Sequence, residues 1–202
     1  SYQNIRSFRK EFKNVPVLAL TATATLKVVD EISEKLELQN PKIVKQSFKR
    51  SNINIVIENN SDKYQKIKNI LSQNKATGII YTRTRKEAEQ LTAFLKGNKI
   101  NNVEFYHAGL NRNEKLAIQN QWMNSSSRVL ISTNAFGMGI DKDDVRFVIH
   151  FSPSPSIENF YQEIGRAGRD GAESLAYMIY NENELNNLDS IIKNQIPTKE
   201  EY

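Results

Sequence analysis

Short apolar runs alternate with amphipathic stretches along most of the chain, from Val15 almost to the C-terminus. The runs are rich in β-branched and aromatic residues, as are strands that are buried on both faces of a parallel sheet. The stretches between them have the length and periodicity of helices that connect such strands. The pattern therefore predicts an α/β fold. The predicted strands are residues 15–20, 79–81, 103–106, 129–131, 147–150 and 175–180.

Helices are predicted at residues 25–38, 86–96, 112–123 and 155–164, and a last one after Glu184. The clearest is 155–164, where Ser154 can cap the helix and Pro155 suits its first turn. Apolar side chains recur there with helical spacing, so we expect all four to face the core. They are Ile157, Phe160, Tyr161 and Ile164.

Residues 45–51 carry three cationic side chains and show no apolar periodicity. Such a stretch is typical of a linker between compact units. We therefore expect one unit on each side of it.

The overall charge is compatible with a polyanionic partner, but it does not establish one. Lys and Arg number 28 against 23 Asp and Glu, which gives a net charge of +5. With no Cys and only His107 and His150, disulfides and cysteine zinc sites are excluded, and we expect no metal site. No apolar run approaches the roughly 20 residues of a membrane-spanning helix, so we expect no membrane partner and a cytoplasmic location.

Four loops carry the candidate chemistry, and we expect them to meet where parallel sheets bind ligands, at the carboxyl ends of the strands. Residues 81–85 combine hydroxyl and guanidinium groups at a helix start, which suits an anion or a solvated helix end equally. Residues 106–110 place His107 and Gly109 before further basic residues, as at a nucleic-acid backbone, although a lone His is more often structural. Residues 132–141 can offer backbone N–H groups to phosphate, with Phe136 as a packing anchor.

The fourth loop contains Arg166 and Arg169, which are spaced three apart and flanked by glycines. Arg forms two parallel hydrogen bonds with phosphate oxygens, so the pair suits a phosphate ligand. Two arginines at a helix end can equally be solvated charges. The pair alone leaves both interpretations open.

Taken together and in order, residues 20–25, 106–110, 133–141 and 161–171 resemble motifs III to VI of RecQ-family superfamily-two ATP-dependent DNA helicases. The resemblance spans nearly the whole chain. It implies a RecA-like parallel sheet flanked by helices at residues 47–202, which is the second helicase lobe. Residues 1–46 would be the C-terminal tail of the first RecA-like lobe.

The resemblance also implies an enzyme that uses ATP with Mg²⁺, moves 3′ to 5′ along single-stranded DNA and separates partly duplex DNA. Its partners would be that DNA and the first lobe of the same protein, which would hold the Mg²⁺. The roles implied for individual residues fall into three groups. Arg169 would be the arginine finger with Arg166 beside it, and Gln162 and Asp141 would help bind the nucleotide; Thr21 and Thr23 would couple the lobes; Arg85, His107, Gly109, Arg112 and Thr133 would hold the DNA backbone.

The chain contains no Gly-x-x-x-x-Gly-Lys-Ser/Thr loop, which in this family binds the β- and γ-phosphates. We therefore expect the chain alone to be inactive. Two alternatives stay open. One is a lobe of a DEAD-box-like RNA helicase, and the other is a non-catalytic nucleic-acid-binding module on a helicase-lobe scaffold.

Overall fold

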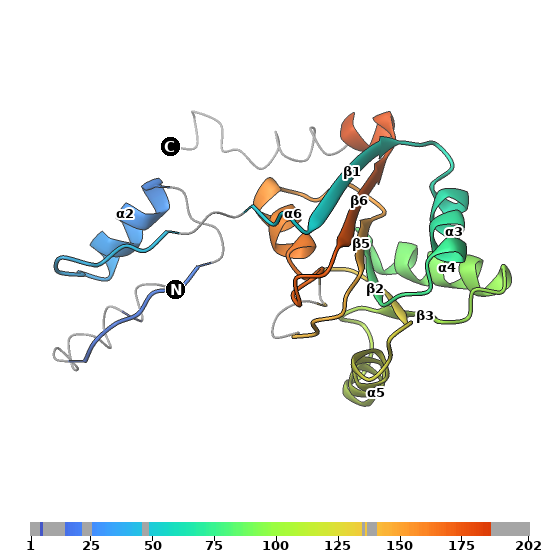
Figure 1. The fold of residues 1–202 in the computed structure, drawn as a ribbon, viewed down its shortest axis with the longest axis horizontal. Helices are drawn as coiled ribbons and strands as arrows, with labels where there is room; N and C mark the ends of the chain where they lie inside the picture. The colour runs from blue at the N-terminus through green and yellow to red at the C-terminus, as the bar shows by residue number, and fades with distance from the viewer. Residues whose placement is uncertain are drawn as a thin grey trace. The chain divides into compact units, whose positions relative to one another are not determined.

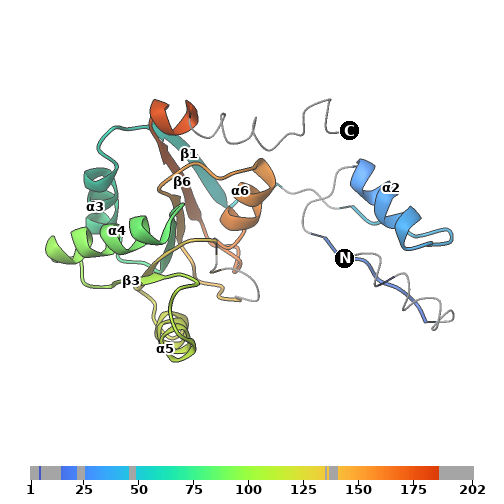
Figure 2. The same cartoon turned by 180° about the vertical axis from the view of Figure 1, so that it is seen from behind.

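The computed structural model describes Ile5 and residues 15–21, 26–45, 49–134, 136 and 141–186. The chain forms two compact units, unit 1 at residues 1–49 and unit 2 at residues 50–202 (Figures 1 and 2). Each is a body of its own.

Unit 1 contains helix α2 (Leu26–Lys35), inside the stretch predicted as helical. Leu36 is buried, and Val29 and Ile32 are partly buried. The strand predicted at residues 15–20 is wrong, because this segment has no regular secondary structure. A strand needs a neighbour to satisfy its backbone groups, and the described part of unit 1 provides none. Leu18 and Leu20 are accordingly 80% and 83% exposed.

Unit 2 is built on a six-stranded sheet with the order β1-β6-β5-β2-β4-β3, in which every pairing is parallel. This confirms the predicted α/β class. The strands are β1 (Ile53–Asn59), β2 (Gly78–Tyr81), β3 (Val103–Tyr106), β4 (Val129–Ser132), β5 (Phe147–His150) and β6 (Ser174–Tyr180). The helices are α3 (Lys63–Gln73), α4 (Arg85–Gly97), α5 (Arg112–Met123) and α6 (Ile157–Ile164).

Helices cover both faces of this sheet, and successive strand residues alternate between two cores. Ile80 packs with buried residues of α3 and α4, whereas its neighbours Ile79 and Tyr81 pack with Trp122 of α5 and with α6. The side chains of β2 are buried throughout. This two-sided burial explains why the inner strands read as continuous apolar runs.

Strand β1 and helix α3 were not predicted. β1 lies at the edge of the sheet and pairs with β6 alone, so Ile55 and Ile57 remain 41% and 60% exposed. Its apolar run is limited to Ile55, Val56 and Ile57, which lie between the polar residues Asn54 and Glu58. In α3 only Lys63, Ile67 and Leu71 are buried. Edge elements with little buried surface give a weak periodic signal.

Helix α6 begins later and buries less than its sequence predicts. Its cap is Ser156, whose Oγ accepts a hydrogen bond from the Asn159 amide at 3.2 Å, so Pro155 lies before the helix. Phe160 and Ile164 are buried as expected, but Ile157 is 67% and Tyr161 42% exposed. A helix of eight residues makes about two turns and rests on the sheet through one i, i+4 pair.

Candidate functional site

A cavity of about 400 Å³ opens where β2, β4 and β5 end and extends along α6. Its walls are residues 81–83 at the end of β2, Asn134 and Phe136 after β4, and His150 with residues 152–155 at the end of β5. Helix α6 and its C-terminal end contribute the remaining side chains. Of the four predicted loops, those after β2 and β4 therefore meet in this cavity, whereas residues 106–110 after β3 do not line it.

The inner wall of the cavity is formed by two stacked rings, Tyr81 and His150, whose centroids are 5.6 Å apart. Burial raises the pKa of the Tyr81 phenol, and the nearby Arg166 guanidinium opposes this shift. The Tyr81 hydroxyl donates to the backbone oxygen of Phe136 at 3.2 Å. Phe136 itself is 1% exposed, which confirms its predicted role as a packing anchor.

Glu163 ties α6 to the end of β5. Its Oε2 lies 2.7 Å from His150 Nε2 and accepts a hydrogen bond from Ser154 Oγ at 2.6 Å. His150 is almost fully buried, so this link lies under the cavity. It holds the face of α6 that carries Gln162 and leads to Arg166, both of which line the cavity. The structure thus brings these two predicted nucleotide-binding residues together.

Arg169 lies apart from the cavity lining and is partly exposed. Its Nη1 pairs with Oδ1 of Asp141, whose side chain is 82% exposed. The two predicted nucleotide-binding residues at this place are therefore in contact with each other. Such an exposed pair is weak and exchanges readily for another anion.

Residues 165–171, which we call the arginine loop, start at this cavity with Arg166 but then leave the carboxyl ends of the strands, so that expectation was wrong for the rest of the loop. The Gly168 amide donates to the backbone oxygen of Val145, directly before β5, at 2.8 Å. The loop continues into Ser174, where β6 starts. Because α6 leads away from the carboxyl end of β5, the loop that follows it reaches the amino ends of β5 and β6. The candidate site consequently involves both edges of the sheet.

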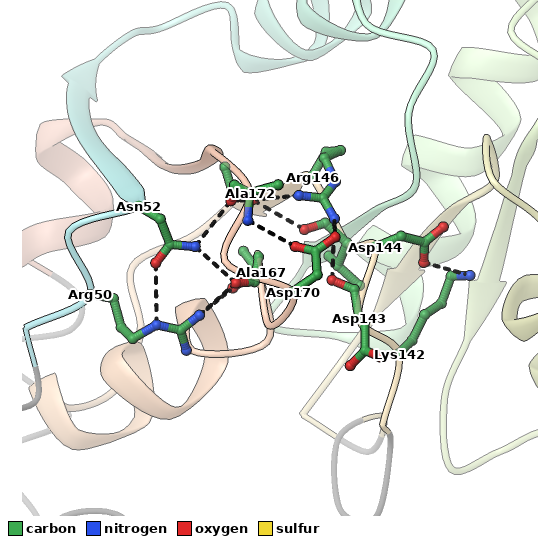
Figure 3. Close-up of polar contacts among 12 residues, drawn as sticks. Arg50, Asn52, Lys142, Asp143, Asp144, Arg146, Ala167, Asp170 and Ala172 are labelled. Atoms are coloured by element: carbon green, nitrogen blue, oxygen red, sulfur yellow. Dashed lines mark hydrogen bonds and ion pairs between the residues drawn. The ribbon is translucent and has the colours of Figure 1, made fainter.

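Ionic contacts hold the outer part of the arginine loop (Figure 3). Arg146 pairs with Asp170 and also donates to the backbone oxygen of Asp143 at 3.2 Å. The hydrogen bond from Arg146, followed by one from the Ala172 amide, lowers the pKa of Asp170. Asp170 therefore stays ionised and keeps its partner over the neutral range.

A second group of predicted residues lies next to β3, and we call it the β3 cluster: Arg85, His107, Gly109 and Arg112. A Cβ added at Gly109 would lie 3.1 Å from Arg85 Nη1 and 3.1 Å from His107 Nδ1. The structure therefore places these three residues side by side, and a side chain at position 109 would crowd the other two. His107 is buried, stacks on Phe105, and its Nε2 lies 2.9 Å from Oε1 of Glu89.

Arg85 and Arg112 are the first residues of α4 and α5. Each helix starts with a capping box, from Thr84 with Glu87 and from Asn111 with Glu114. Both guanidinium groups are thus carried on helix N-termini, where backbone N–H groups and the helix dipole favour anions. Within the described residues, neither forms an ion pair.

The remaining predicted residues are more scattered. Thr133 follows β4 and is 8% exposed, with its backbone oxygen accepting from the Phe136 amide at 3.2 Å. Thr21 is exposed in unit 1, and Thr23 lies outside the described residues. No helix in the described part of the chain is long and apolar enough to cross a membrane. The described residues also contain no cluster of three or more His, Cys, Asp or Glu side chains that could hold a metal ion.

Sequence reasoning missed several residues that the structure places at the site. Ser152 lines the cavity although it belongs to no periodic pattern, and Asn134, which lies in the predicted loop 132–141, lines it without having been assigned a role. Arg50 and Asn52 contact the arginine loop, although Arg50 was assigned to a linker. Their contacts connect residues more than 110 positions apart, so no local pattern could reveal them.

Comparisons with known proteins agree with this architecture. Residues 62–171 match the family model for the helicase conserved C-terminal domain. A probable ATP-dependent DNA helicase, RecS of Bacillus subtilis, is 38% identical over 99% of this chain and 41% of its own length. The ATP-dependent helicase SGS1 of Saccharomyces cerevisiae is 39% identical over 95% of this chain and 13% of its own length. The chain thus spans less than half of these relatives.

Among solved structures, S. cerevisiae Dbp5 bound to RNA and ADP BeF3 superposes with a TM-score of 0.71. The match covers 94% of this chain and 51% of that one at 23% identity, so it shows the fold alone. The fold is that of the RecA-like C-terminal lobe of helicases, and the sequence relatives are of the RecQ type. The chain therefore belongs to the helicase C-terminal domain family, in its RecQ branch.

Proposed function

We propose that unit 2 is the second motor lobe of an ATP-dependent DNA helicase that moves 3′ to 5′ along single-stranded DNA. One observation supports this above the others. Gln162 and Arg166 line a cavity, while Arg169 extends from the same loop with an exposed guanidinium. We infer that Arg166 binds the phosphate as a fixed cation, and that Arg169 exchanges its carboxylate partner for the phosphate during transfer. The RecS and SGS1 relatives are named as ATP-dependent helicases.

In this proposal Arg169 is the arginine finger. Its partner Asp141 is a single, highly exposed carboxylate, and the dianionic γ-phosphate of ATP can replace it with two parallel hydrogen bonds. A finger acts on the charge that develops during phosphoryl transfer, where it contributes about 10³ to 10⁵ in rate.

Arg166 has a different role, as a fixed phosphate contact. Its side chain is partly buried beside Tyr81 and therefore less free to reorient. Gln162 lines the same cavity one helical turn earlier. ATP brings Mg²⁺ with it, and we assign the metal to residues of the first lobe, outside this chain.

The β3 cluster would hold the DNA backbone. It combines unpaired guanidinium groups with helix N-termini, and such contacts bind phosphates without reading base sequence. Binding should accordingly tolerate many sequences and weaken steeply with salt. Thr133 would add a contact after β4.

The test compares the purified chain with the full-length protein that contains it. We expect no ATP turnover from the chain alone, and DNA-stimulated turnover from the full-length protein. Duplexes with a single-stranded 3′ tail should be unwound in preference to those with a 5′ tail. Turnover by the chain alone would contradict the assignment of a half-site, and preference for 5′ tails would contradict the polarity.

Two further measurements address the alternatives. Competition between DNA and RNA strands of equal sequence tests the substrate, since preference for strands with 2′-hydroxyls would favour the DEAD-box-like interpretation. A full-length protein that binds DNA but hydrolyses no ATP would favour the non-catalytic module.

A further inference from the structure

Arg50 and Asn52, among the first residues of unit 2, form hydrogen bonds with the backbone of the arginine loop (Figure 3). Arg50 Nη2 donates to the backbone oxygen of Gly168 at 2.7 Å and to that of Ala167 at 3.4 Å. Asn52 Nδ2 donates to the same Gly168 oxygen at 2.8 Å and to that of Ala172 at 3.0 Å. Two side chains thus converge on one carbonyl group.

Both side chains are themselves held in place. Asn52 Oδ1 accepts a hydrogen bond from Arg50 Nε at 3.3 Å, so the amide orientation follows from its partners. The backbone oxygen of Asn52 accepts from the Ser174 amide at 2.9 Å. Asn52 is therefore anchored where β1 and β6 begin to pair, and its side chain has little freedom to move.

The arginine loop is tightly packed against Asn52 at Gly168. Gly168 has a φ of +56°, and a Cβ there would lie 2.5 Å from Asn52 Nδ2 and 2.7 Å from the Ala172 oxygen. Its amide is fixed as well, because it donates to Val145 at 2.8 Å. Both backbone groups of Gly168 are thus bonded, and its carbonyl begins the peptide that leads to Arg169.

We propose that Arg50 and Asn52 are positioning residues for ATP hydrolysis, which aim Arg169 by fixing the peptide between Gly168 and Arg169. This inference rests on the proposed function. Arg50 is also the first residue of unit 2, so the chain enters the lobe at the point where it holds the arginine loop.

The decisive variant is Asn52→Asp in the full-length protein. It keeps the shape of the side chain but places oxygen where two carbonyl groups accept hydrogen bonds. We expect kcat for DNA-stimulated ATP hydrolysis to fall about 10- to 100-fold, with KM for ATP and affinity for single-stranded DNA unchanged. Affinity for ADP with aluminium fluoride, which mimics the transferring phosphoryl group, should fall while affinity for ADP alone is kept.

Arg50→Ala should show the same pattern, and Arg50→Lys should restore part of kcat, since an ammonium can still donate to Gly168. The matched control is Asn54→Asp, an exposed position in β1 two residues after Asn52, which should behave as wild type. A general loss of folding would lower the thermal midpoint and all affinities together.

The outcomes separate this inference from the proposed function. If the wild-type full-length protein hydrolyses no ATP, the proposed function fails. If the wild type is active and Asn52→Asp keeps its kcat and its affinity for the fluoride complex, the positioning role is overturned and the function stands. An equal loss in Asn54→Asp would also overturn the inference.

Discussion

The two groups of arginines in unit 2 differ in how their charge is used. In and around the arginine loop two cations pair with carboxylates: Arg169 with Asp141 and Arg146 with Asp170. In the β3 cluster, Arg85 and Arg112 form no ion pair within the described residues. Around the arginine loop these contacts fix the orientation of the cations, whereas the guanidinium groups of the β3 cluster remain available to a ligand.

This difference matches two kinds of phosphate chemistry. A group that acts on a transferring phosphoryl must be held within a narrow geometry, because catalysis depends on preorganised charge. A track for a nucleic-acid backbone needs cations that neutralise phosphates wherever the strand is placed. Four predictions test the contrast.

The largest effect is expected from Arg169→Ala in the full-length protein. DNA-stimulated kcat should fall about 10³-fold or more while KM for ATP changes little, because the finger acts mainly in the transition state. Steady-state ATPase assays measure both. Arg128→Ala serves as the control, since that guanidinium donates to Gln121 on α5 at 3.0 Å and faces neither group. A lost affinity for ATP would instead make Arg169 a ground-state ligand.

The tight packing of the arginine loop at Gly168 predicts that alanine substitutions at its two positive-φ glycines differ in how much they lower the free energy of unfolding. Gly168→Ala meets backbone and side-chain atoms at 2.5–2.7 Å with φ at +56°, so the free energy of unfolding should fall by about 2–4 kcal/mol. Gly171→Ala has φ at +83° but nothing within 4 Å, and should cost about 1 kcal/mol. Urea unfolding of the chain measures both. Equal losses would show that the loop is not packed as described.

Binding of DNA by the β3 cluster should depend on the salt concentration more than on the exact geometry of its side chains. Arg85→Ala and Arg112→Ala should each weaken binding of single-stranded DNA by a few-fold, to the same extent for different sequences. The slope of log affinity against log salt should fall by about 0.7 for each lost phosphate contact. Lys99→Ala, an exposed cation between α4 and β3, is the control. An unchanged slope would remove these arginines from the track.

The smallest effect concerns a charge far from both groups. Hydrogen bonds from Lys66, Tyr177 and Asn60 hold the pKa of Glu58 at about 2, below its ordinary 4.5. Its contribution to stability is therefore complete above pH 4.5 and is lost as the pH falls towards 2. Glu58→Gln should lower stability at pH 7 by about 1 kcal/mol or less and flatten the acid limb of the stability curve. ATPase and DNA binding at neutral pH should not change.

How much the sequence predicted depends on whether a pattern is local. The buried strands and α4 follow from periodicity, and the predicted partners Arg85, His107 and Gly109 do lie together. The edge reached by the arginine loop could not be predicted, because it depends on where α6 ends relative to the sheet. The role of Asn52 could not be predicted for a similar reason. It depends on a contact with Gly168, which the spacing of residues along the sequence does not indicate.

The hydrogen bond between His150 and Glu163 also determines what kind of ligand the cavity accepts. Since a carboxylate oxygen accepts hydrogen bonds, this contact places a proton on His150 Nε2. The other ring nitrogen, Nδ1, is buried and has no hydrogen-bond partner among the described residues. His150 therefore offers a ligand no free polar atom, and a ligand of this cavity meets the aromatic rings of Tyr81 and His150 together with the charge of Arg166. An inhibitor designed for this cavity needs an apolar group as well as an anionic one.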